Sequence, residues 1–348
     1  MPDLNRREPW VSFCMSTYRR PDFLKKSLVL IGTQTFADFE VIVSDNDPEG
    51  SAASVVQEMK DERFRYYHNG DNLGMIRSFN KSIERATGQF IVMITDDDPV
   101  YPEMLQTLYD LSLQYPGYGM YFGGHNTYFE SLPEARMANA RVGMVSGLAD
   151  AELGAIKTFN AADFPLAYLR TEIAGQFLWS TGVVRREIAM EIGGLPDYGV
   201  PPLADCGYIL LSGSRAGCVC INQALGHRTI HKANHSYSKA NYEGIYGAPD
   251  RFYKWIIDRL PSDKINDTLV HALQHYVGRD LTVSVILIKR TLDSTHQDSA
   301  AFEDFARRFF KLPYLKRWKL KYYISVHFPR SFEFFLALRK LLSPQPKK

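Results

Sequence analysis

Three consecutive acidic side chains, Asp96, Asp97 and Asp98, follow the apolar run FIVMIT. Neighbouring carboxylates raise one another's pKa and destabilise a fold unless solvent or a cation lies among them. Oxygen ligands at the end of a strand suit a hard divalent cation, and Mg²⁺ or Mn²⁺ usually completes its shell with water and substrate phosphates. A metal that bridges a diphosphate would also stabilise the charge that develops on a leaving group. The triplet therefore predicts a site for a metal and a diphosphate.

Other polar residues also follow apolar runs. Asp45 closes the run FEVIVSD, and Thr17, Tyr18 and Arg19 follow VSFCMS. A charged turn taken alone is usually solvated surface. If the acidic segments and the cationic segment meet at one edge of a sheet, Arg19 becomes a candidate to help hold the anion.

The elements that would position these residues alternate between β-rich runs and helix-length stretches from Trp10 to about Gly124. This alternation, with nearly continuous apolar runs, is typical of a parallel sheet covered by helices. The expected strands are 10–17, 39–46, 63–69 and 89–95, and the expected helices are 21–34, about 51–60 and about 74–86. In open α/β sheets ligands gather beyond the carboxyl ends of the strands, which is where all three polar segments fall.

Two later segments add candidates. Asp205 follows a Pro-rich turn and opens an apolar stretch of helical length, so its simplest role is to cap a helix. The run GHRTIHKANHS carries Arg228, His231, Lys232 and His235. These side chains could hold an anion, or the run could be a solvated loop.

Composition excludes several classes of protein. The chain has 348 residues, 45% of them hydrophobic, and a formal net charge of +2, so neither disorder nor nucleic-acid binding is expected. Its four cysteines show neither metal-ligand spacing nor a disulfide framework, which favours a reducing cytoplasm. The N-terminus lacks an apolar signal region, and no apolar run reaches the roughly 18 to 20 residues that span a bilayer. We therefore expect a protein that is soluble or attached only at a membrane surface.

The C-terminal region is helical from about residue 250, and its last stretch is basic and rich in aromatic residues. Such an amphipathic tail can lie on an anionic membrane. The alternative is that Trp318, Tyr322, Phe334 and Leu338 pack onto the main domain while the lysines face water. The sequence leaves both readings open.

Four segments together resemble the inverting family-two glycosyltransferases, whose fold is called GT-A. They are VSFCMSTYRRPDFLKKSL, FEVIVSDND, DNLGMIRSFNKSIERATGQFIVMITDDDPVYPEML and IGGLPDYGVPPLADCGY. The resemblance covers about residues 8–235. It implies a GT-A domain over 1–248, with a nucleotide-sugar half at about 8–124 and an acceptor half at about 125–248, followed by a helical region at 249–348.

The resemblance also implies roles for the residues at the strand ends. Thr17, Tyr18 and Arg19 match the loop that lines the nucleotide pocket, and Asp45 matches the carboxylate that contacts the base, usually uracil. The acidic triplet matches the motif that binds metal and ribose. Within it Asp98 is the first choice as a metal ligand, Asp96 is a second, and Asp97 is placed at the donor.

Later residues match the family as well. Asp205 matches the general base that takes a proton from the acceptor hydroxyl, and His231 resembles the histidine that approaches metal or diphosphate. Ala204 precedes Asp205 where many relatives have an acid, so Asp197 is the alternative base.

A second departure from the family pattern lies after the NLG motif. Phe79 precedes Asn80 where many relatives have an arginine, and Arg77 is expected to supply that charge. Over the acceptor side, His125, Trp179 and Thr181 are candidates for sugar contacts, with core packing the main alternative for Trp179.

The function implied by this resemblance is a metal-dependent, inverting hexosyl transfer. The donor would be a nucleotide sugar, most simply a UDP-sugar, and the acceptor a saccharide or lipid-linked glycan in polysaccharide or glycoconjugate assembly. We expect Mn²⁺ or Mg²⁺ as cofactor and a cytoplasmic location, peripheral to the membrane if the tail binds it. One alternative is a nucleotidyltransferase, although STYRRPDFL lacks the glycines of a triphosphate loop. The other is a non-catalytic module that binds glycans or membranes.

Overall fold

The computed structural model describes residues 8–129, 144, 145, 148, 151–171, 173, 178–199, 203–230, 245, 247–294 and 300–328. The chain forms two compact units. Unit 1 comprises Met1–Tyr128, Arg141–Thr229 and Trp255–Ile265, and unit 2 comprises Phe129–Ala140, Ile230–Lys254 and Asn266–Lys348. The chain therefore passes between the units more than once, and the domain boundary at residue 248 stays a prediction.

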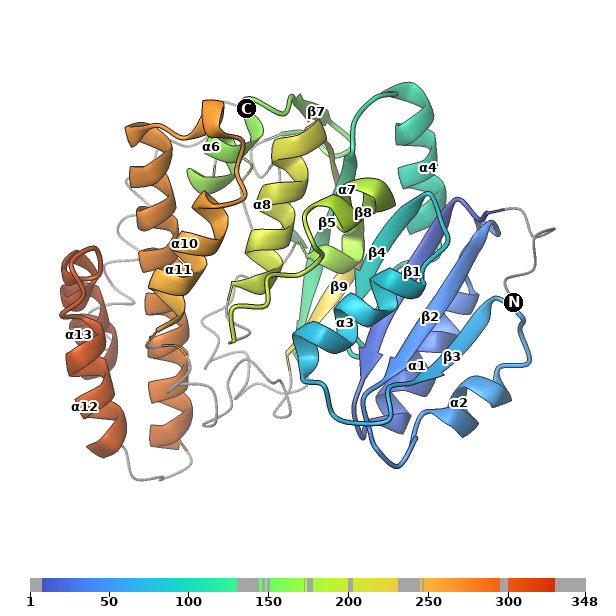
Figure 1. Ribbon diagram of the computed structural model, residues 1–348, viewed down its shortest axis with the longest axis horizontal. Helices are drawn as coiled ribbons and strands as arrows, with labels where there is room; N and C mark the ends of the chain where they lie inside the picture. Colours follow the sequence, from blue (N-terminus) through green and yellow to red (C-terminus); the bar gives the residue numbers. More distant parts are fainter. Residues whose placement is uncertain are drawn as a thin grey trace. The chain divides into compact units, whose positions relative to one another are not determined.

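Unit 1 is built on a sheet whose first half is parallel. Its strands β1 (Val11–Thr17), β2 (Phe39–Asp45), β3 (Phe64–His68) and β4 (Phe90–Ile94) lie in the order β3-β2-β1-β4 (Figure 1). All three pairings within this half are parallel. The strands expected from the sequence are confirmed, and so is the α/β class with a central sheet.

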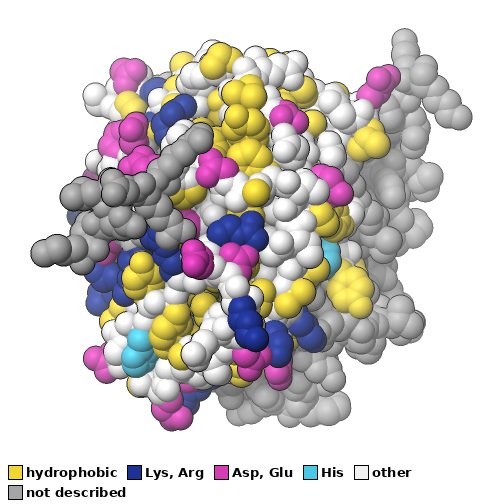
Figure 2. All heavy atoms as spheres, turned by 90° about the vertical axis from the view of Figure 1, so that its right-hand side faces the viewer, with side chains coloured by type: hydrophobic (Ala, Val, Ile, Leu, Met, Phe, Trp, Pro, Cys, Tyr) yellow, Lys and Arg dark blue, Asp and Glu magenta, His cyan; other side chains and the backbone are white. Residues whose placement is uncertain are grey.

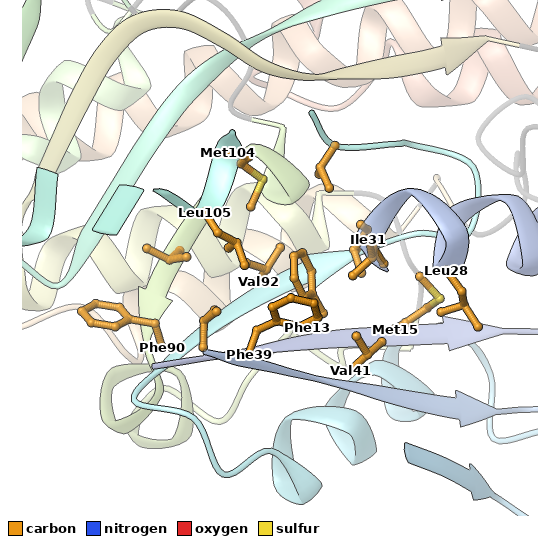
Figure 3. Close-up of a cluster of buried hydrophobic side chains, with 14 of the residues drawn as sticks. Phe13, Met15, Leu28, Ile31, Phe39, Val41, Phe90, Val92, Met104 and Leu105 are labelled. Atoms are coloured by element: carbon orange, nitrogen blue, oxygen red, sulfur yellow. The ribbon is translucent and has the colours of Figure 1, made fainter. Parts of the chain in front are cut away.

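Helices connect the parallel strands and cover the sheet. They are α1 (Pro21–Gly32), α2 (Ala53–Glu58), α3 (Met75–Arg85) and α4 (Met104–Gln114). Pro21 stands in the first turn of α1, where its missing N–H costs nothing. Nearly every residue of β1 and β2 is buried, which explains their continuous apolar runs. Figure 3 shows this core, in which side chains of the sheet lie among side chains of α1 and α4. The sheet contributes Phe13, Met15, Val41 and Val92, α1 contributes Leu28 and Ile31, and α4 contributes Met104 and Leu105.

The sheet continues beyond β4 with antiparallel strands. β8 (Gly182–Arg185) pairs with β4 and with β5 (Met120–Phe129), and the order then runs through β9 (Cys218–Ile230) to β7 (Ile156–Phe159). A short strand, β6 (Met144–Val145), pairs with β5. The predicted sheet is thus extended into a mixed one, because these strands do not follow the strand–helix–strand repeat of the first half.

The remaining helices of unit 1 flank this second half. They are α6 (Phe164–Leu169), α7 (Arg186–Glu191), α8 (Ala204–Ala216) and the 3₁₀ turns η1 (Trp179–Thr181) and η4 (Ser262–Lys264). α10 (Ala248–Ile257) begins in unit 2 and ends in unit 1. The other helices of unit 2 are α11 (Asp267–Ser294), α12 (Ala300–Phe309), η5 (Lys316–Trp318) and α13 (Lys319–His327). Among the described residues, none of the helices has the length and apolar character needed to cross a membrane.

Candidate active site at the carboxyl ends of the parallel strands

The strand register brings the predicted polar segments to one edge of the sheet. Thr17 at the end of β1 lies opposite Asp45 at the end of β2, and β4 ends at Ile94, opposite Met15. The chain after β4 continues to the same edge, where the Thr17 hydroxyl donates a hydrogen bond to Asp96 Oδ2 at 2.9 Å. We call this edge, with the loops that follow β1, β2 and β4, the acidic rim.

Arg20 neutralises part of the acidic rim. Its Nη1 donates to Asp96 Oδ1 at 2.8 Å and its Nη2 donates to Asp97 Oδ2 at 2.9 Å. Such a bridge of two carboxylates by one planar guanidinium fixes both side chains in position. Arg20 is therefore a component of the site that the sequence reading missed.

The neighbouring Arg19, which was predicted from the sequence to belong to the site, has other partners. Arg19 Nε donates to Asp47 at 3.1 Å and its Nη2 donates to Glu49 at 3.3 Å. Its backbone lies in the left-handed region, with φ of 53°, an uncommon conformation for a residue with a side chain. Two adjacent arginines thus serve different loops, Arg20 the loop after β4 and Arg19 the loop after β2.

Asp98 is the least compensated carboxylate of the triplet. Its Oδ1 accepts the backbone N–H of Thr229 at 2.9 Å. Burial and the neighbouring charge of Asp97 raise the pKa of Asp98 to about 7, although Thr229 and Arg228 act in the opposite direction. Burial also raises the pKa of Asp96 to about 6, despite the opposing charge of Arg20. A cation bound at the rim would favour the charged form of both groups.

These carboxylates fit the predicted metal in chemistry. Carboxylate oxygens are ligands that Mg²⁺ and Mn²⁺ take, and substrate phosphates and water commonly supply the rest of the shell. Within the described part of the chain no three His, Cys, Asp or Glu residues form a complete metal site. The predicted ligand His231, with Lys232 and His235, lies outside the described residues.

Asp45 is enclosed by its own loop. Its Oδ1 accepts the N–H of Asp47 at 3.0 Å, and its Oδ2 accepts the N–H of Ala52 at 2.9 Å and the Tyr66 hydroxyl at 3.1 Å. The residue has no exposed surface. Asp45 therefore holds the loop before α2 in shape, and its contact with a nucleotide base stays a prediction. Tyr18, which follows β1, is 40% exposed.

Two residues singled out in the sequence pair with each other. Arg77 on α3 donates its Nε to Asp197 Oδ2 at 2.8 Å. Asn80 fixes the loop that carries Asp197, because its side chain accepts the N–H of Leu195 at 2.8 Å and donates to the Leu195 carbonyl at 3.0 Å. Asp197, the alternative base, is thus engaged by a guanidinium.

The residue that departs from the family pattern has a packing role. Phe79 is buried, and its ring lies 5.1 Å from that of Trp179, between centroids. Thr181 is buried too, with its hydroxyl on the backbone carbonyls of Gly123 and Leu178. His125 on β5 is different, because its Nδ1 has no hydrogen-bond partner among the described residues. Burial lowers the pKa of His125 to about 4, so its ring is neutral near pH 7.

Asp205 stands in the first turn of α8, as the sequence predicts for a helix start. The cap position is taken by Leu203, with φ of 68°, so Asp205 is not itself the capping residue. Its side chain is exposed, and its Oδ1 accepts the N–H of Cys206 at 2.8 Å. No described residue forms an ion pair with it. Both acids are exposed, and Asp205 differs from Asp197 in having no ion pair with a described residue.

Comparison with known proteins gives a family profile and partial relatives. The profile described as "Glycosyl transferase family 2" matches residues 12–174. Over 103 residues the chain is 37% identical to an uncharacterized glycosyltransferase of Methanocaldococcus jannaschii, an alignment that covers 28% of this chain and 36% of that protein. Over 118 residues it is 32% identical to the GalNAc(5)-diNAcBac-PP-undecaprenol beta-1,3-glucosyltransferase of Campylobacter jejuni, covering 33% and 38%. The alignments thus span well under half of these relatives.

Solved structures match over nearly the whole chain. Residues 1–349 of S. aureus TarS in complex with UDP-GlcNAc superpose with a TM-score of 0.59 at 14% identity, covering 91% of this chain and 90% of that one. The mannosyltransferase PcManGT from Pyrobaculum calidifontis, in complex with GDP-Man and Mn²⁺, superposes with a TM-score of 0.51 at 14% identity, covering 97% and 89%. At such identities the likeness concerns the fold, and the predicted GT-A fold is confirmed.

Proposed function

We propose that this chain transfers a sugar from a nucleotide sugar to an acceptor hydroxyl, because its residues 12–174 match the profile of glycosyl transferase family 2. The observation that carries the proposal is the acidic rim. Buried carboxylates of Asp96 and Asp98 are held in place by Thr17, Arg20 and the Thr229 N–H. A rigid set of buried acids suits a cation and the diphosphate that it accompanies.

We propose that Asp98 and Asp96 would hold Mn²⁺ or Mg²⁺, with His231 as a further ligand. When bound, the metal would neutralise charge on the departing nucleoside diphosphate. Arg20 lies at the same place with its side chain 28% exposed, so its guanidinium could also donate to diphosphate oxygens. Tyr18 and the loop held by Asp45 would receive the nucleotide, and uridine is the nucleoside that the family resemblance favours.

Asp205 is the proposed general base. It would take the proton of the acceptor hydroxyl while the oxygen attacks the anomeric carbon from the face opposite the diphosphate. The new bond joins the acceptor oxygen to the anomeric carbon, and the bond from that carbon to the diphosphate oxygen breaks, so the configuration inverts. Arg77 holds Oδ2 of Asp197, so only Oδ1 of that carboxylate has no partner among the described residues.

The acceptor is proposed to be a saccharide or lipid-linked glycan at the cytoplasmic face of a membrane. The Campylobacter jejuni relative is named for an undecaprenol-linked glycan, which supports this class of acceptor. Polysaccharide or glycoconjugate assembly would be the corresponding process.

A donor panel tests the proposal. The protein is incubated with Mn²⁺ and one nucleotide sugar at a time, and release of the nucleoside diphosphate is followed with and without saccharide acceptors. We expect one donor to be consumed, with metal dependence. Consumption of a nucleoside triphosphate with release of pyrophosphate would instead identify a nucleotidyltransferase, and no consumption of any donor would favour a binding module.

A further inference from the structure

Helix α13 has one packed side and one exposed side. Tyr322 and Ser325 are buried, and the Ser325 carbonyl accepts a hydrogen bond from Arg290 of α11 at 3.4 Å. Facing away from them are exposed residues that we call the α13 surface: Lys316, Arg317, Lys319, Leu320, Tyr323, His327 and Phe328. Of the residues that the packing alternative named, Tyr322 is buried within unit 2, and the membrane alternative stays a prediction. Phe334 and Leu338 lie outside the described residues.

The apolar members of the α13 surface are large and adjacent. Leu320 is 66% exposed, Tyr323 50% and Phe328 52%. The Tyr323 ring lies 4.5 Å from that of His327 and 6.0 Å from that of Phe328, between centroids. Residues 320, 323 and 327 also follow the spacing of one helix stripe. These side chains therefore form one solvent-exposed apolar patch, which is uncommon on the surface of a folded protein.

The charge along the segment that carries this patch has one sign. From Phe305 to Phe328 the chain contains seven Lys or Arg residues and no Asp or Glu. Arg307 and Arg308 reach back to Asp304, but no described residue forms an ion pair with the basic members of the α13 surface. The face of unit 1 in Figure 2, by contrast, has acidic and basic side chains interspersed.

Large apolar side chains surrounded by unpaired cations match one kind of partner, a bilayer surface with anionic headgroups. The cations are attracted to the headgroup phosphates, and the apolar side chains enter the boundary with the acyl chains. A neutral protein partner would leave the cations without compensation, and a nucleic acid would leave the aliphatic Leu320 without a contact. We propose that the α13 surface docks unit 2 onto an anionic lipid bilayer.

This inference deepens the proposed function, because a lipid-linked acceptor would lie in the membrane to which unit 2 binds. Its test is separable from the chemistry. Vesicle binding needs neither donor nor metal, and donor cleavage in solution needs no vesicles. If vesicle binding fails, donor cleavage still tests the proposed function, and if donor cleavage fails, vesicle binding still tests this inference.

The experiment measures co-sedimentation of the full chain with phosphatidylcholine vesicles, with and without phosphatidylglycerol. Each cation near an anionic surface strengthens binding by about fivefold, so K316Q/R317Q/K319Q should bind about 100-fold more weakly. The affinity of L320S/Y323S/F328S for the vesicles should fall by at least about tenfold, because the apolar side chains that enter the bilayer are removed. The matched controls are K26Q/K157Q/K254Q and L113S, which change exposed residues elsewhere and should bind as the unchanged protein does. Circular dichroism melts check that each variant is folded.

The expected result is binding that requires phosphatidylglycerol, weakens with salt, and is lost in both α13 variants. The proposal is overturned if the unchanged protein ignores anionic vesicles, or if folded α13 variants bind as well as their controls. Binding to RNA or heparin without binding to vesicles would also overturn it and would identify a polyanion site instead.

Discussion

The acidic rim of unit 1 is rich in carboxylates and the α13 surface of unit 2 is rich in cations, and the two regions treat their charge in opposite ways. At the rim, Asp96 and Asp98 are buried and each is held by a hydrogen bond to a fixed donor. On α13 the cations are exposed and unpaired within the described structure. Buried and fixed like charges create a specific site for one counter-charge at high local cost. Exposed like charges create a diffuse attraction that salt can screen.

The largest expected effect separates the two candidate bases. D205N should lower sugar transfer by about 10² to 10⁴-fold, because a general base is lost, while donor affinity stays the same. The measurements are initial transfer rates and calorimetric donor binding. D197N is the matched control and should retain most of the rate. If D197N is the slower variant, the base is Asp197 and the exposed position of Asp205 has no catalytic meaning.

A second prediction compares two adjacent arginines. R20A should destabilise the protein by roughly 2 kcal/mol or more, because it removes the guanidinium that two largely buried carboxylates share. R19A removes an arginine whose side chain is 54% exposed, and its buried partner Asp47 keeps the Glu49 N–H as a donor, so the loss of stability should be smaller. Urea denaturation of both variants measures the difference. Equal stabilities would mean that Arg20 does not compensate the rim.

The third prediction concerns how much the ionised form of Asp98 destabilises the folded protein. Folding raises the pKa of Asp98 from 3.8 to about 7, so its contribution to stability is lost as pH rises through about 7. D98N removes that charge and can still accept the Thr229 N–H. In EDTA at pH 8, D98N should melt a few degrees above the unchanged protein, and the gap should narrow at pH 5. Addition of Mn²⁺ should stabilise the unchanged protein more than D98N. If the difference in melting temperature is the same at both pH values, folding does not raise the pKa of Asp98.

The smallest expected effect is that of the α13 surface on nucleotide affinity, because we expect the two regions to act independently. L320S/Y323S/F328S should leave nucleotide affinity within about twofold, since none of these side chains belongs to the rim. Calorimetric titration with the best nucleotide measures it. A large loss of affinity would show that the α13 surface and the rim are energetically coupled.

Local patterns were enough to predict the first half of the sheet and its edge. Continuous apolar runs identified β1, β2 and β4, and the rule that loops gather at carboxyl ends brought Thr17 and the acidic triplet together. The choice between Arg19 and Arg20 could not be read in this way. It depends on a positive φ at Arg19, which no residue type in STYRRP signals.

Contacts between distant residues were also beyond the sequence. The pairs Arg77–Asp197 and Asn80–Leu195 join positions 120 and 115 residues apart, and no spacing rule reports them. Two antiparallel strands of the second half, β8 and β7, were missed because each is only four residues long, too short to show a period. In the tail, periodicity indicated an amphipathic helix but not which aromatic residues would be packed inside.

The central claim is that the acidic rim binds a nucleoside diphosphate through a metal held by Asp98. Calorimetric titration of the unchanged protein and of D98A with UDP, GDP, CDP and ADP, each with and without Mn²⁺, tests it most directly. The account predicts that one diphosphate binds the unchanged protein tightly only when Mn²⁺ is present, and that D98A loses this dependence. Binding that ignores both Mn²⁺ and the D98A change, or no binding of any diphosphate, would contradict it.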